Sequence, residues 1–177
     1  MTYDKKNAGK PVGPIVSAAL LASGGMPAVS ELEFALNSAT NAWHRWMVRC
    51  ASAAGSTGLT ATDVLVLHHV NHRGREKTLA DLCLLTSIED THLVNYSIKK
   101  LAGMGLVQTG RRGKEKTVAA TADGTEACER YHEIREALLI ESMKTLGLDE
   151  QEISKLASLL RSLSGQYDQA ARAAASL

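Results

Sequence analysis

The sequence predicts a mainly α-helical fold that contains one small β-hairpin. Three observations carry this prediction: an aliphatic composition, long stretches in which apolar residues recur every three or four positions, and one stretch near residue 110 that loses this period. Of the 177 residues, one is Phe, two are Trp and four are Tyr, so the core must be mostly Leu, Ala, Val and Ile. Such side chains suit the packing of helices on helices, and the chain is long enough for a core of its own.

The N-terminal part is expected to begin with an irregular arm, residues 1–29, because this stretch holds all three prolines and several glycines. A short helix at Ile15–Ala22 is expected within it. Ser30 followed by Glu33 has the spacing of a capping box, in which side chain and backbone cap each other at a helix start. Apolar residues then recur at helical spacing as far as Cys50, which predicts a helix of about 24 residues with one apolar face.

Three further helices are expected before the period changes. Thr60 with Asp63, and Thr78 with Asp81, have the spacing of capping boxes at the starts of the next two. After a turn at residues 86–89, a fourth helix is expected at 90–102, ended by glycines. The order of these segments predicts two helices joined by a tight turn.

The hairpin is predicted from residues 106–112 and 117–121, which look like short strands on either side of a tip at residues 113–115. A helical stretch should follow from Gly124 to about Leu146, and a last helix from Asp149. Residues 30–177 are thus expected to form a single domain. Its central lobe would be 60–124, flanked by helices at 30–54 and 149–173.

The stretch from residue 78 to residue 107 is the one that indicates a function. A short helix, a tight turn and a second helix that leads into a strand are typical of a helix-turn-helix, whose second helix lies in the DNA major groove. Val94, Ile98 and Leu101 would dock that second helix on the protein. The polar residues expected to contact DNA from these two helices are Thr78, Thr91, His92, Asn95, Tyr96, Lys99 and Lys100.

The hairpin adds cations that could contact phosphate or the minor groove. These candidates are Arg111, Arg112, Lys114 and Lys116. Residues 60–120 carry nine Lys and Arg against six Asp and Glu, whereas residues 121–177 carry six against ten. This asymmetry fits one anion-facing region and another region turned elsewhere.

The segment resembles the multiple-antibiotic-resistance regulator (MarR) family of winged helix-turn-helix proteins. The matching residues lie in order along the chain: Leu79-Ala80-x-Leu82, Ile98-x-x-Leu101, Gly105-Leu106-Val107, Arg111 with Arg112, and Val118-x-x-Thr121-x-x-Gly124. With the flanking helices, the resemblance covers residues from about 30 to 165. Two features depart from the family pattern. No acidic residue comes just before Arg111 and Arg112 of the hairpin, which is called the wing in this family. Glu89 and Asp90 lie at the start of the second helix of the helix-turn-helix, the reading helix.

The resemblance implies a homodimer in which the first and last helices of two subunits interlock, so that two reading helices meet a near-palindromic operator in double-stranded DNA. It also implies a regulator, most simply a repressor, whose DNA binding a small-molecule effector modulates. Trp43 and Trp46 are candidates to line a ligand pocket, although packing in the dimer core is the alternative. The first and last helices do carry more apolar surface than a small core needs.

Two alternatives stay open. The chain could be a winged-helix module for dimerisation or protein interaction without direct DNA reading, which Glu89 and Asp90 would favour. It could also be an oxidant or metal sensor through Cys50 or through His68 and His72, which are four apart. We expect no metal, no cofactor and no enzyme activity, because no catalytic motif is present. Three scattered cysteines and no long apolar run suggest a cytoplasmic protein away from membranes.

Overall fold

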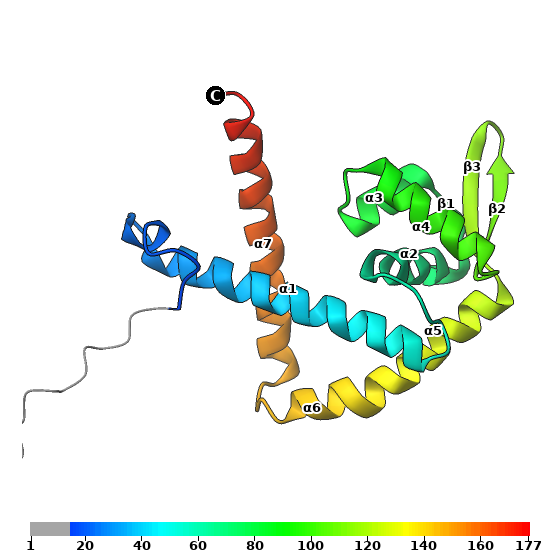
Figure 1. Ribbon diagram of the computed structural model, residues 1–177, viewed down its shortest axis with the longest axis horizontal. Helices are drawn as coiled ribbons and strands as arrows, with labels where there is room; N and C mark the ends of the chain where they lie inside the picture. The colour runs from blue at the N-terminus through cyan, green and yellow to red at the C-terminus, as the bar shows by residue number, and fades with distance from the viewer. Residues whose placement is uncertain (1–14) are drawn as a thin grey trace, which may run out of the picture. The chain divides into compact units, whose positions relative to one another are not determined.

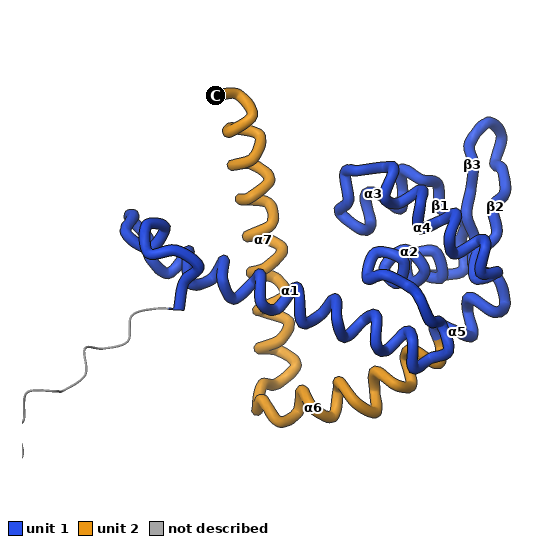
Figure 2. The backbone as a smooth tube through the Cα atoms, in the orientation of Figure 1, with its two compact units in different colours: residues 1–128 blue, residues 129–177 orange. Residues whose placement is uncertain are grey.

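The computed structural model describes residues 15–177 (Figure 1). The chain forms two compact units (Figure 2): one extends to Cys128, and the other comprises Glu129–Leu177. The fold is mostly helical with a small antiparallel sheet, as the sequence predicts. No described helix combines the length and apolar character that a membrane span requires.

The first helix starts earlier than predicted. α1 comprises Pro27–Ala53 and follows a single turn of 3-10 helix, η1, at Leu21–Ser23. The predicted capping box at Ser30 is wrong: Ser30 lies inside α1 and is buried, and no side chain caps the helix start. Pro27 occupies the first position instead, where its missing N–H would have no helical partner in any case. The part of the predicted arm at 1–14 lies outside the described residues.

The three helices of the lobe begin where the sequence predicts. In α2 (Ala61–Asn71), the Thr60 amide donates to the Asp63 carboxylate at 2.8 Å, and the Thr60 hydroxyl accepts from the Asp63 amide. Thr78 and Asp81 make the same pair of bonds at the start of α3 (Leu79–Thr86). α4 (Thr91–Gly103) packs against both α2 and α3. The capping residues therefore fix where each helix enters the lobe.

The sheet has three strands rather than the two expected. β2 (Val107–Arg112) and β3 (Glu115–Ala120) form the hairpin, and β1 (Lys77–Thr78) pairs with β3 on its other edge. β1 has only two residues, too few to show an alternating pattern. The hairpin tip is Gly113 and Lys114, and Gly113 has a positive φ of 65° that favours glycine.

The core of the lobe is aliphatic and lies among α2, α3, α4 and the base of the hairpin. Its fully buried large apolar side chains include Leu82, Leu101, Val64, Val66, Val70 and Val94. At the junction into α5 (Ala122–Ile134), the Thr121 hydroxyl donates to the Gly105 carbonyl at 2.6 Å and accepts from the Gly124 amide at 3.0 Å. A Cβ on Gly124 would lie 1.9 Å from the Leu106 carbonyl oxygen, so this position requires glycine.

The second unit contains the end of α5 and three further helical segments. These are a π-helix, η3, at Arg135–Ile140, then α6 at Glu141–Lys144 and α7 at Glu150–Ala174. α7 begins where the sequence predicts, and Asp149 and Glu152 form a capping box at this start. None of the 25 residues of α7 is buried among the described part of the chain.

Candidate nucleic-acid interface

A groove of about 930 Å³ runs between the start of α3, one side of α4 and the hairpin. Six of the side chains predicted to contact DNA line it: Thr78, Thr91, Asn95, Lys99, Arg111 and Lys116. They come from four elements, β1, α4, β2 and β3 (Figure 1). The fold thus gathers hydroxyl, amide and cationic groups on one concave surface.

Three sides of α4 have different surroundings. The buried side carries Val94, Ile98 and Leu101, as predicted, together with Ser97. Thr91, Asn95 and Lys99, four residues apart, line the groove beside the hairpin. Two more predicted contacts, His92 and Tyr96, are exposed between these sides, and Tyr96 is 67% exposed. One helix therefore docks through apolar groups and presents polar ones outward.

The hairpin places like charges opposite each other. Arg111 pairs in register with Lys116 across β2 and β3, and both side chains line the groove. Like charges directly opposite each other on a sheet are unfavourable unless an anion lies between or beside them. The tip residue Lys114 is exposed at the end of the hairpin. This arrangement suits a phosphate group.

Arg112 has an acidic neighbour on the hairpin itself. Its guanidinium lies 3.8 Å from the carboxylate of Glu115, its register partner, and both side chains are exposed. An exposed pair of this kind contributes little to stability. It nonetheless brings a carboxylate to the hairpin, where residues 108–110 provide none. Glu115, which also lines the groove, was not predicted as part of the site.

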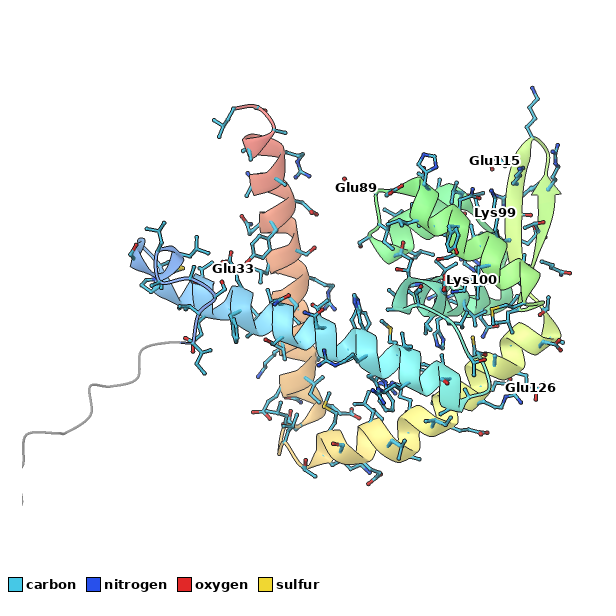
Figure 3. All side chains as sticks on the ribbon, viewed as in Figure 1. Glu33, Glu89, Lys99, Lys100, Glu115 and Glu126 are labelled. Atoms are coloured by element: carbon cyan, nitrogen blue, oxygen red, sulfur yellow. The ribbon has the colours of Figure 1, made fainter. Side chains whose placement is uncertain are left out.

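Lys100 does not lie with the other predicted contacts. Its ammonium donates to the Asp63 carboxylate at 2.7 Å and to the Gly58 carbonyl at 2.7 Å. Figure 3 shows it directed from α4 toward α2, whereas Lys99 lies on the hairpin side. Lys100 therefore does not line the groove with the other predicted contacts, and its ammonium group bonds Asp63 and Gly58 within the lobe.

Asp63 is charged despite its burial. Its residue is 1% exposed, and burial raises the pKa of its carboxyl group. Hydrogen bonds from Lys100, Ser97 and Thr60 outweigh that effect and hold the pKa of Asp63 below its ordinary value. The sequence indicated Asp63 only as a capping residue; nothing in its spacing pointed to Lys100, 37 residues away.

The acidic start of the reading helix has a structural explanation. Asp90 is the N-cap of α4, and its carboxylate accepts from the His92 amide at 2.8 Å. A carboxylate at a helix N-terminus is also favoured by the helix dipole. Glu89 is exposed just before it (Figure 3). Thr78 likewise serves as a cap, so its hydroxyl is partly engaged with the Asp81 amide at 3.1 Å.

His68 lies within α2, but His72 is the C-cap with extended backbone, so their spacing of four residues does not place the two on one helical face. Among residues 15–177, no three His, Cys, Asp or Glu side chains gather as a metal site would require. Cys50 is buried at 1% exposure. Trp43 is exposed and packs near the His44 ring, with centroids 5.7 Å apart, and Trp46 is half-buried.

Comparisons with known proteins agree with this geometry. Residues 59–124 match the model of a winged helix DNA-binding domain. No curated protein sequence matches the chain significantly. The matched range contains α2, α3, α4 and the whole hairpin, so it includes every side chain of the groove. The lobe is therefore a winged-helix DNA-binding domain.

Solved structures extend the likeness beyond the lobe. A MarR variant from E. coli bound to operator DNA is 19% identical, with a TM-score of 0.64 over 80% of this chain and 99% of that one. A probable transcriptional regulator from Pseudomonas aeruginosa is 26% identical, with a TM-score of 0.53 over 75% and 96% of the two chains. BpsR of Bordetella bronchiseptica, whose DNA binding is regulated by 6-hydroxynicotinic acid, is 24% identical, with a TM-score of 0.56 over 72% and 91%. In its fold, the chain is a MarR-type winged-helix protein, and the resemblance seen in the sequence is confirmed.

Proposed function

We propose that the protein is a homodimeric, sequence-specific DNA-binding transcription regulator of the cytoplasm, most simply a repressor. The groove between α4 and the hairpin carries this proposal, because it brings Asn95, Lys99, Arg111 and Lys116 to one surface. The winged-helix match over residues 59–124 supports the same use of that surface.

In this proposal, α4 enters the major groove and reads base edges. Asn95 can bond adenine through two hydrogen bonds, and Lys99 can reach guanine or a phosphate. His92 and Tyr96 are exposed on the outer side of α4. In this proposal they would face the same major groove of the DNA. Arg111, Lys114 and Lys116 would contact the sugar–phosphate backbone from the hairpin, which fixes the register of the protein on DNA.

The exposed apolar side chains outside the lobe support the homodimer. Leu156 and Leu160 of α7 are 51% and 38% exposed, which is costly for leucines that no partner covers. Residues 30–54 and 149–173 would then be the dimerisation helices and 60–124 the DNA-binding lobe. Two lobes held in this way would meet two half-sites of a near-palindromic operator.

An effector is also proposed. The DNA binding of BpsR, which has a similar fold, is regulated by 6-hydroxynicotinic acid, and this supports the proposal. In this chain Trp43 and Trp46 are candidates to contact such a ligand, which would act through different affinities for two arrangements of the lobes.

The test is a salt-titrated DNA-binding assay with fragments selected from the source genome by the purified protein. The parent should bind selected fragments far more tightly than random duplex, with a steep decrease in affinity as salt rises. Changing Arg111 and Lys116 to Ala should weaken binding and reduce the salt slope by about one for each phosphate that the protein no longer neutralises.

The matched control on the hairpin is Glu115→Gln, which removes a negative charge from the groove and should strengthen binding. If no fragment binds above the level of random duplex, the regulator proposal is wrong. A dimeric protein with that result would support the winged-helix module without DNA reading. Of the two acids that favoured that alternative, Glu89 and Asp90, the second is accounted for, because Asp90 caps α4.

A further inference from the structure

Two adjacent lysines on the reading helix have opposite surroundings. Lys99 is exposed and lines the groove, whereas Lys100 is directed at α2, with 26% of its side chain exposed (Figure 3). Successive residues on a helix are about 100° apart, so one lysine can face a ligand while the next faces the protein. Lys100, which the sequence analysis assigned to DNA, therefore makes a charged contact inside the lobe.

The contact joins α4 to the start of α2 through a short network of hydrogen bonds. One Asp63 carboxylate oxygen accepts from the Lys100 ammonium at 2.7 Å and from the Thr60 amide at 2.8 Å. The Lys100 ammonium also donates to the Gly58 carbonyl at 2.7 Å. The loop before α2, the first turn of α2 and the last turns of α4 are thereby tied at one point.

The other contacts between these helices are less directional. Val94, Ile98 and Leu101 dock α4 through apolar packing, which tolerates small rotations and shifts of a helix. Hydrogen bonds to a charged group are directional and strong, and a carboxylate that is 1% exposed has no water to replace a missing partner. A small rotation of α4 would move Asn95 and Lys99 relative to the hairpin cations.

We propose that Asp63 and Lys100 are positioning residues, which fix the rotation of the reading helix and so set DNA specificity without touching DNA. This inference rests on the proposed function, since it assumes that α4 reads DNA. Its prediction differs from that for a phosphate contact. Loss of the pair should weaken specific binding and leave the number of neutralised phosphates unchanged.

The experiment compares Lys100→Gln and Asp63→Asn with the neighbouring control Lys99→Gln. Each full-length variant is titrated with a selected genomic duplex and with random duplex across a range of salt concentrations. Lys100→Gln and Asp63→Asn should each lose at least about tenfold in specific affinity, with little change in random-duplex binding or in salt slope. Lys99→Gln should lose affinity for both duplexes, and its salt slope should fall by about one.

A double variant guards against simple unfolding. Asp63→Asn combined with Lys100→Gln removes both charges and leaves two amides that can bond each other. Its loss of specific affinity should be smaller than the summed losses of the single variants, because the two residues act as one unit. Additive losses, a lower salt slope in Lys100→Gln, or parent-like specific affinity in that variant would each overturn the proposal.

Hydrogen exchange without DNA separates this inference from the proposed function. The α4 amides of Lys100→Gln and Asp63→Asn should exchange at least about tenfold faster than those of the parent, while those of Lys99→Gln should not. If the parent binds no specific duplex but exchange changes in this way, the regulator proposal fails and the anchoring role stands. Unchanged exchange in all three variants would overturn the proposal that Asp63 and Lys100 hold α4 in place.

Discussion

The winged-helix lobe and helix α7 use similar aliphatic residues in opposite ways. The lobe buries Leu82, Val94 and Leu101 completely and satisfies its helix starts with its own capping boxes. α7 also has a capping box, yet Leu159 is 68% exposed and no residue of the helix is buried in the described chain. Capping therefore fixes where a helix begins, while burial decides whether its apolar side has a partner.

Stability is therefore divided unevenly along the chain. Burying a leucine side chain contributes about 1.5–3 kcal/mol, so the lobe holds most of the stability that one chain can supply. An amphipathic helix in water gains most of its stability from packing on its apolar side. We therefore expect the lobe to tolerate changes in α7, and α7 to depend on a second copy of the chain.

The largest expected effect comes from charging the apolar side of α7. Replacing both Leu156 and Leu160 with Asp should convert the dimer to a monomer, because each change removes buried apolar area and adds a charge to the interface. We expect the dimer Kd to rise at least about 100-fold, which corresponds to about 2.7 kcal/mol. Analytical ultracentrifugation over a range of protein concentrations measures this change.

Ser158→Asp is the matched control for α7, since Ser158 lies on the opposite side of the helix from Leu156 and Leu160. The control should leave the oligomeric state unchanged. Urea unfolding should show the lobe intact in both variants. A dimer that survives the double change would mean that α7 is not the main dimer contact and does not depend on a second copy of the chain.

The next effect lies in the lobe. Gly124→Ala would place a Cβ 1.9 Å from the Leu106 carbonyl oxygen, and backbone on both sides would have to move. We expect a loss of about 2–3 kcal/mol in the free energy of unfolding, as for other overpacked sites. Urea denaturation followed by circular dichroism gives the value.

Gly103→Ala serves as the control, because a Cβ there meets nothing within 4 Å and the residue ends α4 without a positive φ. That variant should gain up to about 1 kcal/mol from the higher helix propensity of Ala. Equal stabilities for the two variants would show that the Leu106 contact relaxes freely, and that the lobe is less tightly packed at this junction than its burial suggests.

The sequence was most informative where a local rule specifies a local structure. Thr60, Thr78 and Asp149 each predict a helix start that the structure confirms, because a capping box involves residues only three apart. The same rule failed at Ser30, where the helix simply continues backward to Pro27. A capping sequence permits a start but does not forbid helix before it.

The site was less predictable because its geometry depends on distant residues. The wing cations and the polar residues of α4 could be chosen by type and spacing, and six of the predicted side chains do line one groove. Lys100 has the same type and spacing, yet a carboxylate 37 positions earlier turns it inward. Strand β1 was missed for a similar reason, since its two residues form a strand only through pairing with β3.

The smallest expected effect is a pH dependence confined to the lobe. Burial lowers the pKa of His68, and the neighbouring His69 lowers it further. The folded lobe therefore binds this proton less readily than the unfolded chain, in which His titrates near 6.5. Stability should be fully present above about pH 6.5 and should decrease as the pH falls below that value toward the folded pKa.

His68→Gln should flatten this dependence, which urea unfolding at a series of pH values between about 7.5 and 5 would reveal. His69→Gln should have an effect of the same sign, because burial also lowers the pKa of His69, as do His72 and Lys77. The double variant should therefore be flatter than either single one. If the free energy of unfolding of the parent instead increases as the pH falls through this range, the burial of His68 does not govern its protonation.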